Sequence, residues 1–109
     1  ASVIVVDDSV NMAWLVHKTV HFFKHESCGK CTPCREGTYW MEQITRRIAH
    51  GGAAPEDVTL LEAVATQMQG KCLCALGEFA IEAVLTGIER FPEDFAARPT
   101  VQAPETVTN

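Results

Sequence analysis

The sequence has few of the features that mark membrane, secreted or nucleic-acid-binding proteins. Nowhere in its 109 residues does an apolar run approach the ~20 residues of a membrane-spanning helix, so no direct membrane insertion is expected. A signal peptide, with a basic start, an apolar centre and a small-residue cleavage site, is not predicted either. Nine Lys and Arg stand against fourteen Asp and Glu, which argues against nucleic acid as a partner, because such binding depends on neutralising phosphates.

Nucleotide-binding motifs are missing as well. The sequence has no G-x-G-x-x-G, no Walker loop and no G-x-S-x-G, so these residues are not expected to bind a nucleotide or a flavin. What it does contain is five cysteines, more than an ordinary intracellular domain of this length carries and fewer than a small disulfide scaffold. An odd number of cysteines without a secretion signal indicates a reducing compartment.

Apolar residues recur at helical spacing in four stretches. The predicted helices cover about residues 9–25, 32–50 and 55–70, and a fourth helix lies between the connection 71–77 and Pro92. Four amphipathic helices with short connections predict an all-α four-helix bundle. The side chains expected to close its core are Met12, Leu15, Ile44, Leu61, Val64 and Val84. Large aromatic residues expected in the core or at an interface are Trp14, Tyr39 and Trp40.

The helix boundaries rest on local capping signals. The side chains of Asp7, Asp8 and Ser9 can cap the first helix, and Thr32-Pro33 is a typical start for the second. After the break at Pro92, residues 93–97 are expected to add one more helical turn.

The two ends of the chain are predicted to lie outside the helical bundle. Residues 2–6 predict a strand, and because a single strand cannot satisfy its own edges, we expect a partner strand or a longer polypeptide. The predicted units are a strand and linker from a preceding domain (1–8), a helical bundle that contains all five cysteines (9–97) and a disordered tail (98–109).

The cysteine spacing points to a metal centre. Cys28, Cys31 and Cys34 form C-x2-C-x2-C, and Cys72 and Cys74 follow about forty residues later. A tight loop with two residues between ligands can hold three corners of a cubane, as in bacterial ferredoxins, and the fourth corner then needs a distant ligand. Spacing alone leaves Cys72 and Cys74 as alternatives for that ligand.

Structural zinc is the main alternative cofactor. Zinc is usually held by two separated C-x2-C pairs or by Cys/His pairs, and Cys72-x-Cys74 is too tight for the usual pair. We therefore expect a 4Fe–4S cluster, and keep a structural zinc-binding interaction module with no redox role as the alternative function. Gly29 and Gly70 fit the cluster, because glycine permits close backbone approach or a positive φ, and Gly29 could equally be an ordinary helix-ending glycine.

Three histidines could form a second metal site. His17, His21 and His25 fall at i, i+4 and i+8 on one helix face, and H-x3-H on a helix can bind a metal. No acidic residue completes an H-E-x-x-H motif. We therefore favour a partly solvated polar face, or contact with a neighbouring domain.

Two segments resemble a known family. Residues 26–37, ESCGKCTPCREG, closely resemble a segment of the flavin-bearing, NADH-oxidising subunit of respiratory complex I, also called NADH-quinone oxidoreductase chain 1. Residues 70–75, GKCLCA, are similar to the family's later G-[KR]-x-[FL]-C segment. Related sequences occur in NAD-linked hydrogenases and formate dehydrogenases. The resemblance covers roughly Val10 to Ala97.

The resemblance implies a ligand set that the spacing left open. In the later segment the family's ligand is the last cysteine, so the cofactor-binding residues would be Cys28, Cys31, Cys34 and Cys74, with Cys72 a bystander. It also implies a four-helix bundle with one 4Fe–4S cluster. The strand predicted over residues 2–6 would then be the end of a ubiquitin-like domain that precedes the bundle. It assigns no catalytic residue to this chain.

The resemblance further implies an electron-transfer function. NADH would reduce FMN in N-terminal domains outside this chain, and the cluster would pass single electrons from FMN to the next cluster. The expected partners are those preceding FMN and NADH domains and the neighbouring iron–sulfur subunits. The parent would be an NADH:quinone oxidoreductase in the peripheral arm, on the cytoplasmic side of a bacterial inner membrane or in the mitochondrial matrix. This fragment alone would not be catalytic.

Overall fold

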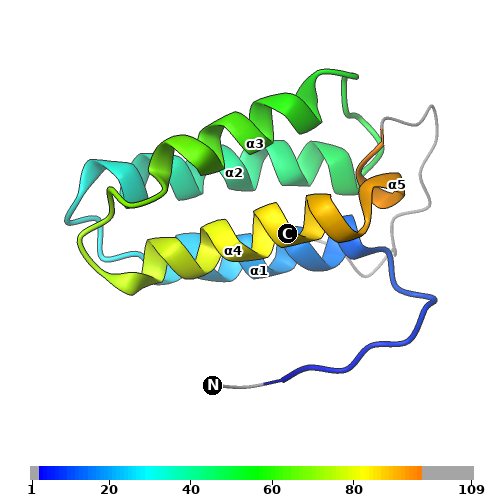
Figure 1. The fold of residues 1–109 in the computed structure, drawn as a ribbon, viewed down its shortest axis with the longest axis horizontal. Helices are drawn as coiled ribbons and strands as arrows, with labels where there is room; N and C mark the ends of the chain where they lie inside the picture. The colour runs from blue at the N-terminus through cyan, green and yellow to red at the C-terminus, as the bar shows by residue number, and fades with distance from the viewer. Residues whose placement is uncertain (1–2, 97–109) are drawn as a thin grey trace.

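Four helices pack side by side with alternating direction in the computed structural model, which describes residues 3–96 (Figure 1). The long helices are α1 (Met12–Glu26), α2 (Thr32–Ala49), α3 (Asp57–Met68) and α4 (Ala75–Arg90), followed by the short α5 (Pro92–Phe95). Helices α1 and α3 each pack against both α2 and α4. The predicted all-α four-helix bundle is confirmed.

Helix α1 begins three residues later than predicted. The side chain of Asn11 is its cap, because Asn11 Oδ1 accepts the backbone N–H of Trp14 at 3.1 Å. The predicted cap Asp7 instead accepts hydrogen bonds from the backbone N–H and the hydroxyl of Ser9. Its carboxylate therefore closes a turn ahead of the helix.

Helix α4 begins inside the predicted connection. Cys74 is its N-cap residue, and Gly77, predicted to end the connection, lies buried within the first turns of the helix. A Cβ at Gly77 would come within 2.3 Å of Cys72 Sγ. This glycine therefore serves close packing and does not mark a helix boundary.

The core draws on every helix. Three of the predicted core residues are buried, namely Ile44, Leu61 and Val84. Three others are only partly buried, namely Met12, Leu15 and Val64. Phe95 of α5 is fully buried against Gly87, where a Cβ would lie 3.3 Å from the Phe95 ring. The turn predicted after Pro92 therefore closes one end of the core.

The aromatic residues lie nearer the surface than a core position would allow. Tyr39 and Trp40 on α2 are 44% and 55% exposed, and Trp14 on α1 is partly buried. The prediction placed these residues in the core or at an interface. The core position is therefore wrong for Tyr39 and Trp40.

The predicted N-terminal strand is not formed by residues 3–6. Val3, Ile4 and Val5 are extended and at least 80% exposed, and no described residue pairs with them. A strand needs a neighbour to accept and donate its backbone hydrogen bonds, and residues 3–96 supply none. The predicted tail, 98–109, lies outside the described residues. Within the described part, no helix has the length and apolarity needed to cross a membrane.

Candidate iron–sulfur site

The two cysteine groups meet at one end of the bundle. At this end α1 and α3 finish and α2 and α4 begin, at the left of Figure 1. All five cysteines line a single cavity of about 240 Å³, together with Glu26, Ser27, Lys30, Leu73 and Leu76. The antiparallel packing of the helices thus brings the residue 28–34 loop beside the residue 72–74 loop.

Two of the cysteines occupy helix N-caps. Cys31 precedes α2 and Cys74 precedes α4, and neither side chain caps its helix through a hydrogen bond. Cys34 follows in the first turn of α2 and is 7% exposed. The backbone N–H groups and the positive dipole ends of two helices therefore lie beside the thiols, where they favour the binding of an anionic group.

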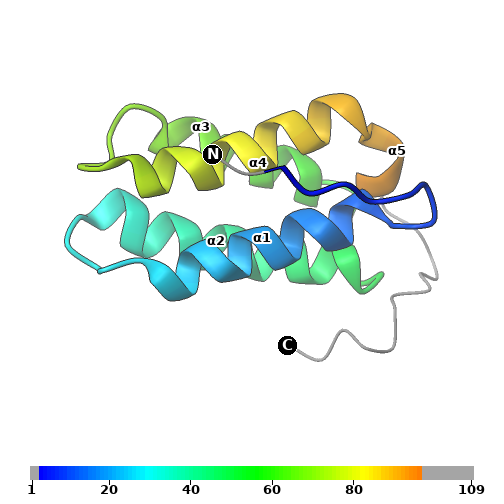
Figure 2. The ribbon, with the colours of Figure 1, turned by 90° about the horizontal axis from the view of Figure 1, so that it is seen from below.

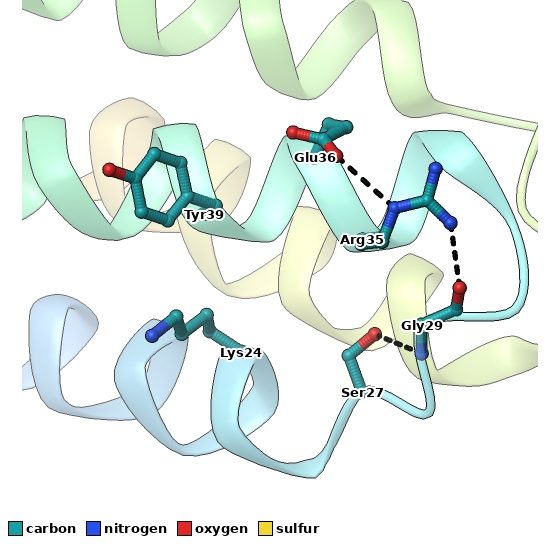
Figure 3. Close-up of a pocket in the computed structure, with 6 residues that line it drawn as sticks. All are labelled: Lys24, Ser27, Gly29, Arg35, Glu36 and Tyr39. Carbon is teal, nitrogen blue, oxygen red and sulfur yellow. Dashed lines mark hydrogen bonds and ion pairs between the residues drawn. The ribbon is translucent and has the colours of Figure 1, made fainter.

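The loop that carries three cysteines is held by its own polar contacts. Gly29 has a φ of +77°, a conformation that glycine adopts without strain. Its backbone N–H donates to Ser27 Oγ at 3.3 Å, and its carbonyl accepts from Arg35 Nη1 at 2.7 Å (Figure 3). Arg35 Nε also donates to Glu36 at 3.1 Å. The side chain of Arg35 thus fastens the loop to α2.

Ser27 also reaches one of the thiols. Its Oγ lies 3.3 Å from Cys34 Sγ. On its other side, Ser27 borders an open cavity of about 350 Å³ with Lys24 and Tyr39, drawn in Figure 3. Sequence reasoning did not single out this serine, although its position directly before Cys28 was a signal that could have indicated it.

A backbone contact joins the two loops. Hydrogen bonding from the backbone N–H of Leu73, and then from that of Cys34, lowers the pKa of the Cys31 thiol. The residue 72–74 loop therefore favours a thiolate on the residue 28–34 loop. No sequence signal could have revealed this contact, because any residue at position 73 other than proline supplies the same N–H.

The environment of Cys72 is different. Its side chain packs against the apolar core, and its Sγ lies against Gly77 of α4. Burial, followed by the nearby thiols of Cys34 and Cys31, raises the pKa of Cys72 to about 11. At neutral pH this sulfur is a protonated thiol in the wall of the cavity.

The donor set fits an iron–sulfur cluster. Thiolate sulfurs are soft ligands that suit iron–sulfur centres, and here they border a volume flanked by Leu73 and Leu76. In residues 3–96, no three His, Cys, Asp or Glu side chains already converge closely enough to hold a single metal ion.

The histidine stripe is not a uniform solvated face. His17 is fully buried, and burial lowers its pKa to about 4. The Thr45 hydroxyl donates to the Met41 carbonyl at 2.8 Å, so we assign the His17 Nδ1–H as the donor to Thr45 Oγ1 at 3.1 Å. The prediction of a partly solvated face is therefore wrong for His17. His21 is partly exposed and His25 is exposed.

A buried carboxylate accompanies these histidines, and the sequence analysis missed it. The Glu42 side chain is 1% exposed and contacts Arg46 and His21, with 3.3 Å to His21 Nδ1. Burial by itself raises the pKa of Glu42, but the hydrogen bonds from Arg46 and His21 outweigh it, and the net shift is downward. The i, i+4 spacing of Glu42 and Arg46 was the available signal.

Comparison with known proteins decides the family. The model of the NADH-ubiquinone oxidoreductase-F iron-sulfur binding region matches residues 14–98, which include both cysteine groups. The chain belongs to this family. The 4Fe–4S cofactor predicted from the cysteine spacing is thereby confirmed, and the family assigns the chain an iron–sulfur role in electron transfer.

Individual relatives agree with the family match. A subunit of the NADH-quinone oxidoreductase of Mycobacterium tuberculosis is 39% identical over 93 residues, which cover 85% of this chain and 21% of the relative. The mitochondrial 51 kDa subunit of NADH-ubiquinone oxidoreductase from Neurospora crassa is 38% identical over 98 residues, 90% of this chain and 20% of the relative. The mitochondrial NADH dehydrogenase flavoprotein 1 of Dictyostelium discoideum is 40% identical over the same length, with the same two shares. The chain thus spans about a fifth of the length of these relatives.

Proposed function

We propose that this chain is the electron-transfer domain of an NADH:quinone oxidoreductase. In this proposal, electrons from NADH reach FMN elsewhere in a longer polypeptide, and pass singly through this domain to the next cluster in a neighbouring subunit. The observation that carries the proposal is the cavity at the N-termini of α2 and α4, which all five cysteines line within the family match. The relatives are named as NADH oxidoreductase subunits, which supports the same activity for the parent of this chain.

Four thiolates would hold the cluster in this proposal: Cys28, Cys31, Cys34 and Cys74. Bound there, a 4Fe–4S cluster supplies one-electron redox chemistry. The protein's own contribution is electrostatic. The N–H groups of Leu73 and Cys34 beside the Cys31 sulfur, and two helix N-termini, favour the more negative reduced state and so raise the reduction potential.

The proposed exclusion of Cys72 has its own support. A thiol whose pKa is raised to about 11 is a poor source of thiolate, and its sulfur is packed against Gly77. Cys74 is exposed, lines the cavity and stands at the N-cap of α4, where the helix dipole favours an anionic group.

The partners and location follow from the same proposal. Preceding FMN- and NADH-binding domains of the same polypeptide would deliver electrons, and neighbouring iron–sulfur subunits would receive them. The assembly would lie in the peripheral arm, on the cytoplasmic side of a bacterial membrane or in the mitochondrial matrix.

Reconstitution distinguishes this function from the zinc alternative. The chain, treated anaerobically with iron and sulfide, should bind about four of each and turn brown, with a colour that bleaches on dithionite reduction. Uptake of one tightly held zinc ion, with no sulfide, would favour a structural zinc module and contradict the proposal.

The electron path needs the intact oxidoreductase. Addition of NADH should reduce the cluster, as followed by electron paramagnetic resonance. Removal of FMN should abolish reduction by NADH, whereas dithionite should still reduce the cluster. Reduction by NADH at an unchanged rate without FMN would refute the proposed path.

A further inference from the structure

A serine hydroxyl lies beside one of the proposed cluster ligands. Ser27 is the C-cap residue of α1, directly before the first of the three clustered cysteines. Figure 2 shows the loop between α1 and α2 at the same end of the bundle as the loop between α3 and α4. Ser27 Oγ lies 3.3 Å from Cys34 Sγ, which is a hydrogen-bond distance for sulfur. The contact therefore joins the end of α1 to a sulfur in the first turn of α2.

The chemistry of the two atoms fixes the direction of this hydrogen bond. A cysteine that ligates iron is a thiolate and has no proton to donate, so the Ser27 hydroxyl is the donor when Cys34 is a ligand. The backbone N–H of Gly29 donates to the same Ser27 Oγ at 3.3 Å. This bond occupies one lone pair of the oxygen and leaves its O–H group free to point at the sulfur.

Two further contacts hold the donor and the acceptor in place. The Gly29 carbonyl accepts a hydrogen bond from Arg35 Nη1 at 2.7 Å (Figure 3). The Cys34 carbonyl accepts one from the hydroxyl of Thr38 at 2.6 Å, and Thr38 is fully buried. The glycine that orients Ser27 and the cysteine that faces it are thus both anchored to α2.

Water competes less for the Cys34 sulfur than for the other proposed ligands. Cys34 is 7% exposed, whereas Cys31 is partly exposed. Cys28 and Cys74 are exposed. A hydrogen bond to a charged acceptor is stronger than one between neutral groups, and it is stronger again where water is excluded. The Ser27–Cys34 contact is therefore the side-chain contact in this loop best placed to act on the cluster.

We propose that the Ser27 hydroxyl raises the reduction potential of the cluster by donating a hydrogen bond to the Cys34 thiolate. Reduction adds one electron, and the thiolate sulfurs carry part of the added negative charge. The donor therefore stabilises the reduced state more than the oxidised state. Ser27 is a positioning residue, because it acts on the cluster through Cys34. The inference rests on the proposed function, in which Cys34 is a ligand.

The test is a redox titration of two serine variants. The polypeptide, purified at the full length its gene encodes and loaded with its cluster, is poised at a series of potentials, and electron paramagnetic resonance gives the reduced fraction. Ser27→Ala should lower the ratio of reduced to oxidised cluster at a given potential by about threefold to tenfold. This change is a shift of roughly 30–60 mV, at about 59 mV per tenfold for one electron. Ser27→Thr keeps a hydroxyl and should restore the original ratio.

Thr32→Val is the matched control. It removes a hydroxyl at the end of the same loop, and that hydroxyl accepts from Arg35 Nη2 at 3.3 Å. The control should leave the ratio unchanged. Equal shifts in Thr32→Val and Ser27→Ala would assign the effect to the loop as a whole and overturn the inference. An unchanged ratio in Ser27→Ala would leave Ser27 with only the structural role of closing the turn at Gly29, and would overturn it too.

A measurement on the unsubstituted protein covers the case in which Ser27→Ala fails to hold its cluster. Electron–nuclear double resonance of the reduced cluster should detect a coupled proton that is replaced by deuterium faster than the backbone amides are. Hydroxyl protons exchange faster than amide protons, and Ser27 borders the open cavity of Figure 3. The absence of such a proton beside a loaded cluster would refute the hydrogen bond.

Iron and sulfide content and reduction by NADH separate this inference from the proposed function. If the unsubstituted protein carries a full cluster that NADH reduces, and Ser27→Ala has the same potential, this inference alone fails. An unsubstituted protein that binds no iron and sulfide would contradict the proposed function, and this inference with it.

Discussion

Serine substitutions at positions 72 and 74 should have opposite effects on the cluster and on the fold. Cys72→Ser is expected to retain a full complement of iron and sulfide, whereas Cys74→Ser is expected to lose the normal cluster. In the metal-free chain, Cys72→Ser should lower the stability more than Cys74→Ser. These opposite effects are expected only if the two cysteines have different roles, because damage common to both variants would lower the cluster content and the stability together.

The burial of each side chain sets the effect on stability. Cys72 is partly buried against the core, and its Sγ is 3.9 Å from the Met68 carbonyl, so a serine hydroxyl there loses solvent with a poor hydrogen-bond partner. We expect Cys72→Ser to lower the free energy of unfolding by about 1 kcal/mol. Cys74 is exposed, and its substitution should change that free energy by about 0.5 kcal/mol or less.

The thiol chemistry gives a physical reason to expect that Cys72 does not replace Cys74. A pKa of about 11, against the usual 9.0, makes the Cys72 thiolate about 3 kcal/mol harder to form, at about 1.4 kcal/mol per pKa unit. This penalty corresponds to roughly a hundredfold loss in affinity for a ligand that must be deprotonated. We therefore expect Cys72 to be disfavoured as a cluster ligand even when Cys74 is replaced.

The assay reconstitutes both variants in parallel under anaerobic conditions. Iron and sulfide per chain and the electron paramagnetic resonance signal of the reduced protein report the cluster. Urea unfolding of the metal-free chains reports stability. A full cluster in Cys74→Ser together with its loss in Cys72→Ser would refute the ligand assignment and the physical argument for it.

Two further predictions concern the packing and titration of the bundle. Gly37→Ala places a Cβ 2.3 Å from Met68 Sδ. It should lower the free energy of unfolding, measured in urea, by about 1–2 kcal/mol after the better helix propensity of alanine is taken into account. Gly52→Ala is the control, because a Cβ at Gly52 has nothing within 4 Å. His17 has a folded pKa of about 4 against 6.5 unfolded, so the unfolded chain binds more protons between these pH values. Stability should therefore fall by about 3 kcal/mol as the pH drops from 6.5 to 4, and His17→Gln should flatten that slope. An unchanged slope in the variant would assign the pH dependence to other groups.

Local signals predicted most of the helical architecture. Helix periodicity, Pro33 in the first turn of α2 and the glycine pair after His50 placed the second helix to within a residue of Thr32–Ala49. The start of α1 was less accurate, because several polar residues compete to cap that helix and only one geometry accepts the Trp14 N–H. Periodicity could not show that Met12 and Leu15 lie on an open face, since it gives the phase of an apolar stripe and not what covers it.

The histidines show a different limit. Their spacing correctly placed His17, His21 and His25 on one helix face, but His17 on that face is fully buried, His21 is partly exposed and His25 is exposed. Helix α2 contributes to this difference, because its Thr45 contacts the buried His17. A neighbour about thirty residues away in the sequence therefore helps to decide whether a histidine on this face is buried.

The sequence by itself determined the helical class, the three-cysteine loop and, through its family, the cofactor, because each depends on the spacing of residues that are close together in the sequence. The tertiary structure decided the surroundings of the second cysteine group. Cys72 and Cys74 are chemically identical and two residues apart, yet antiparallel packing turns the Cys72 sulfur onto Gly77 and the core and leaves Cys74 at a helix N-cap on the cavity. Burial and helix dipoles are properties of the folded arrangement, and they give two like residues different chemical environments, on which the proposed difference in their roles rests.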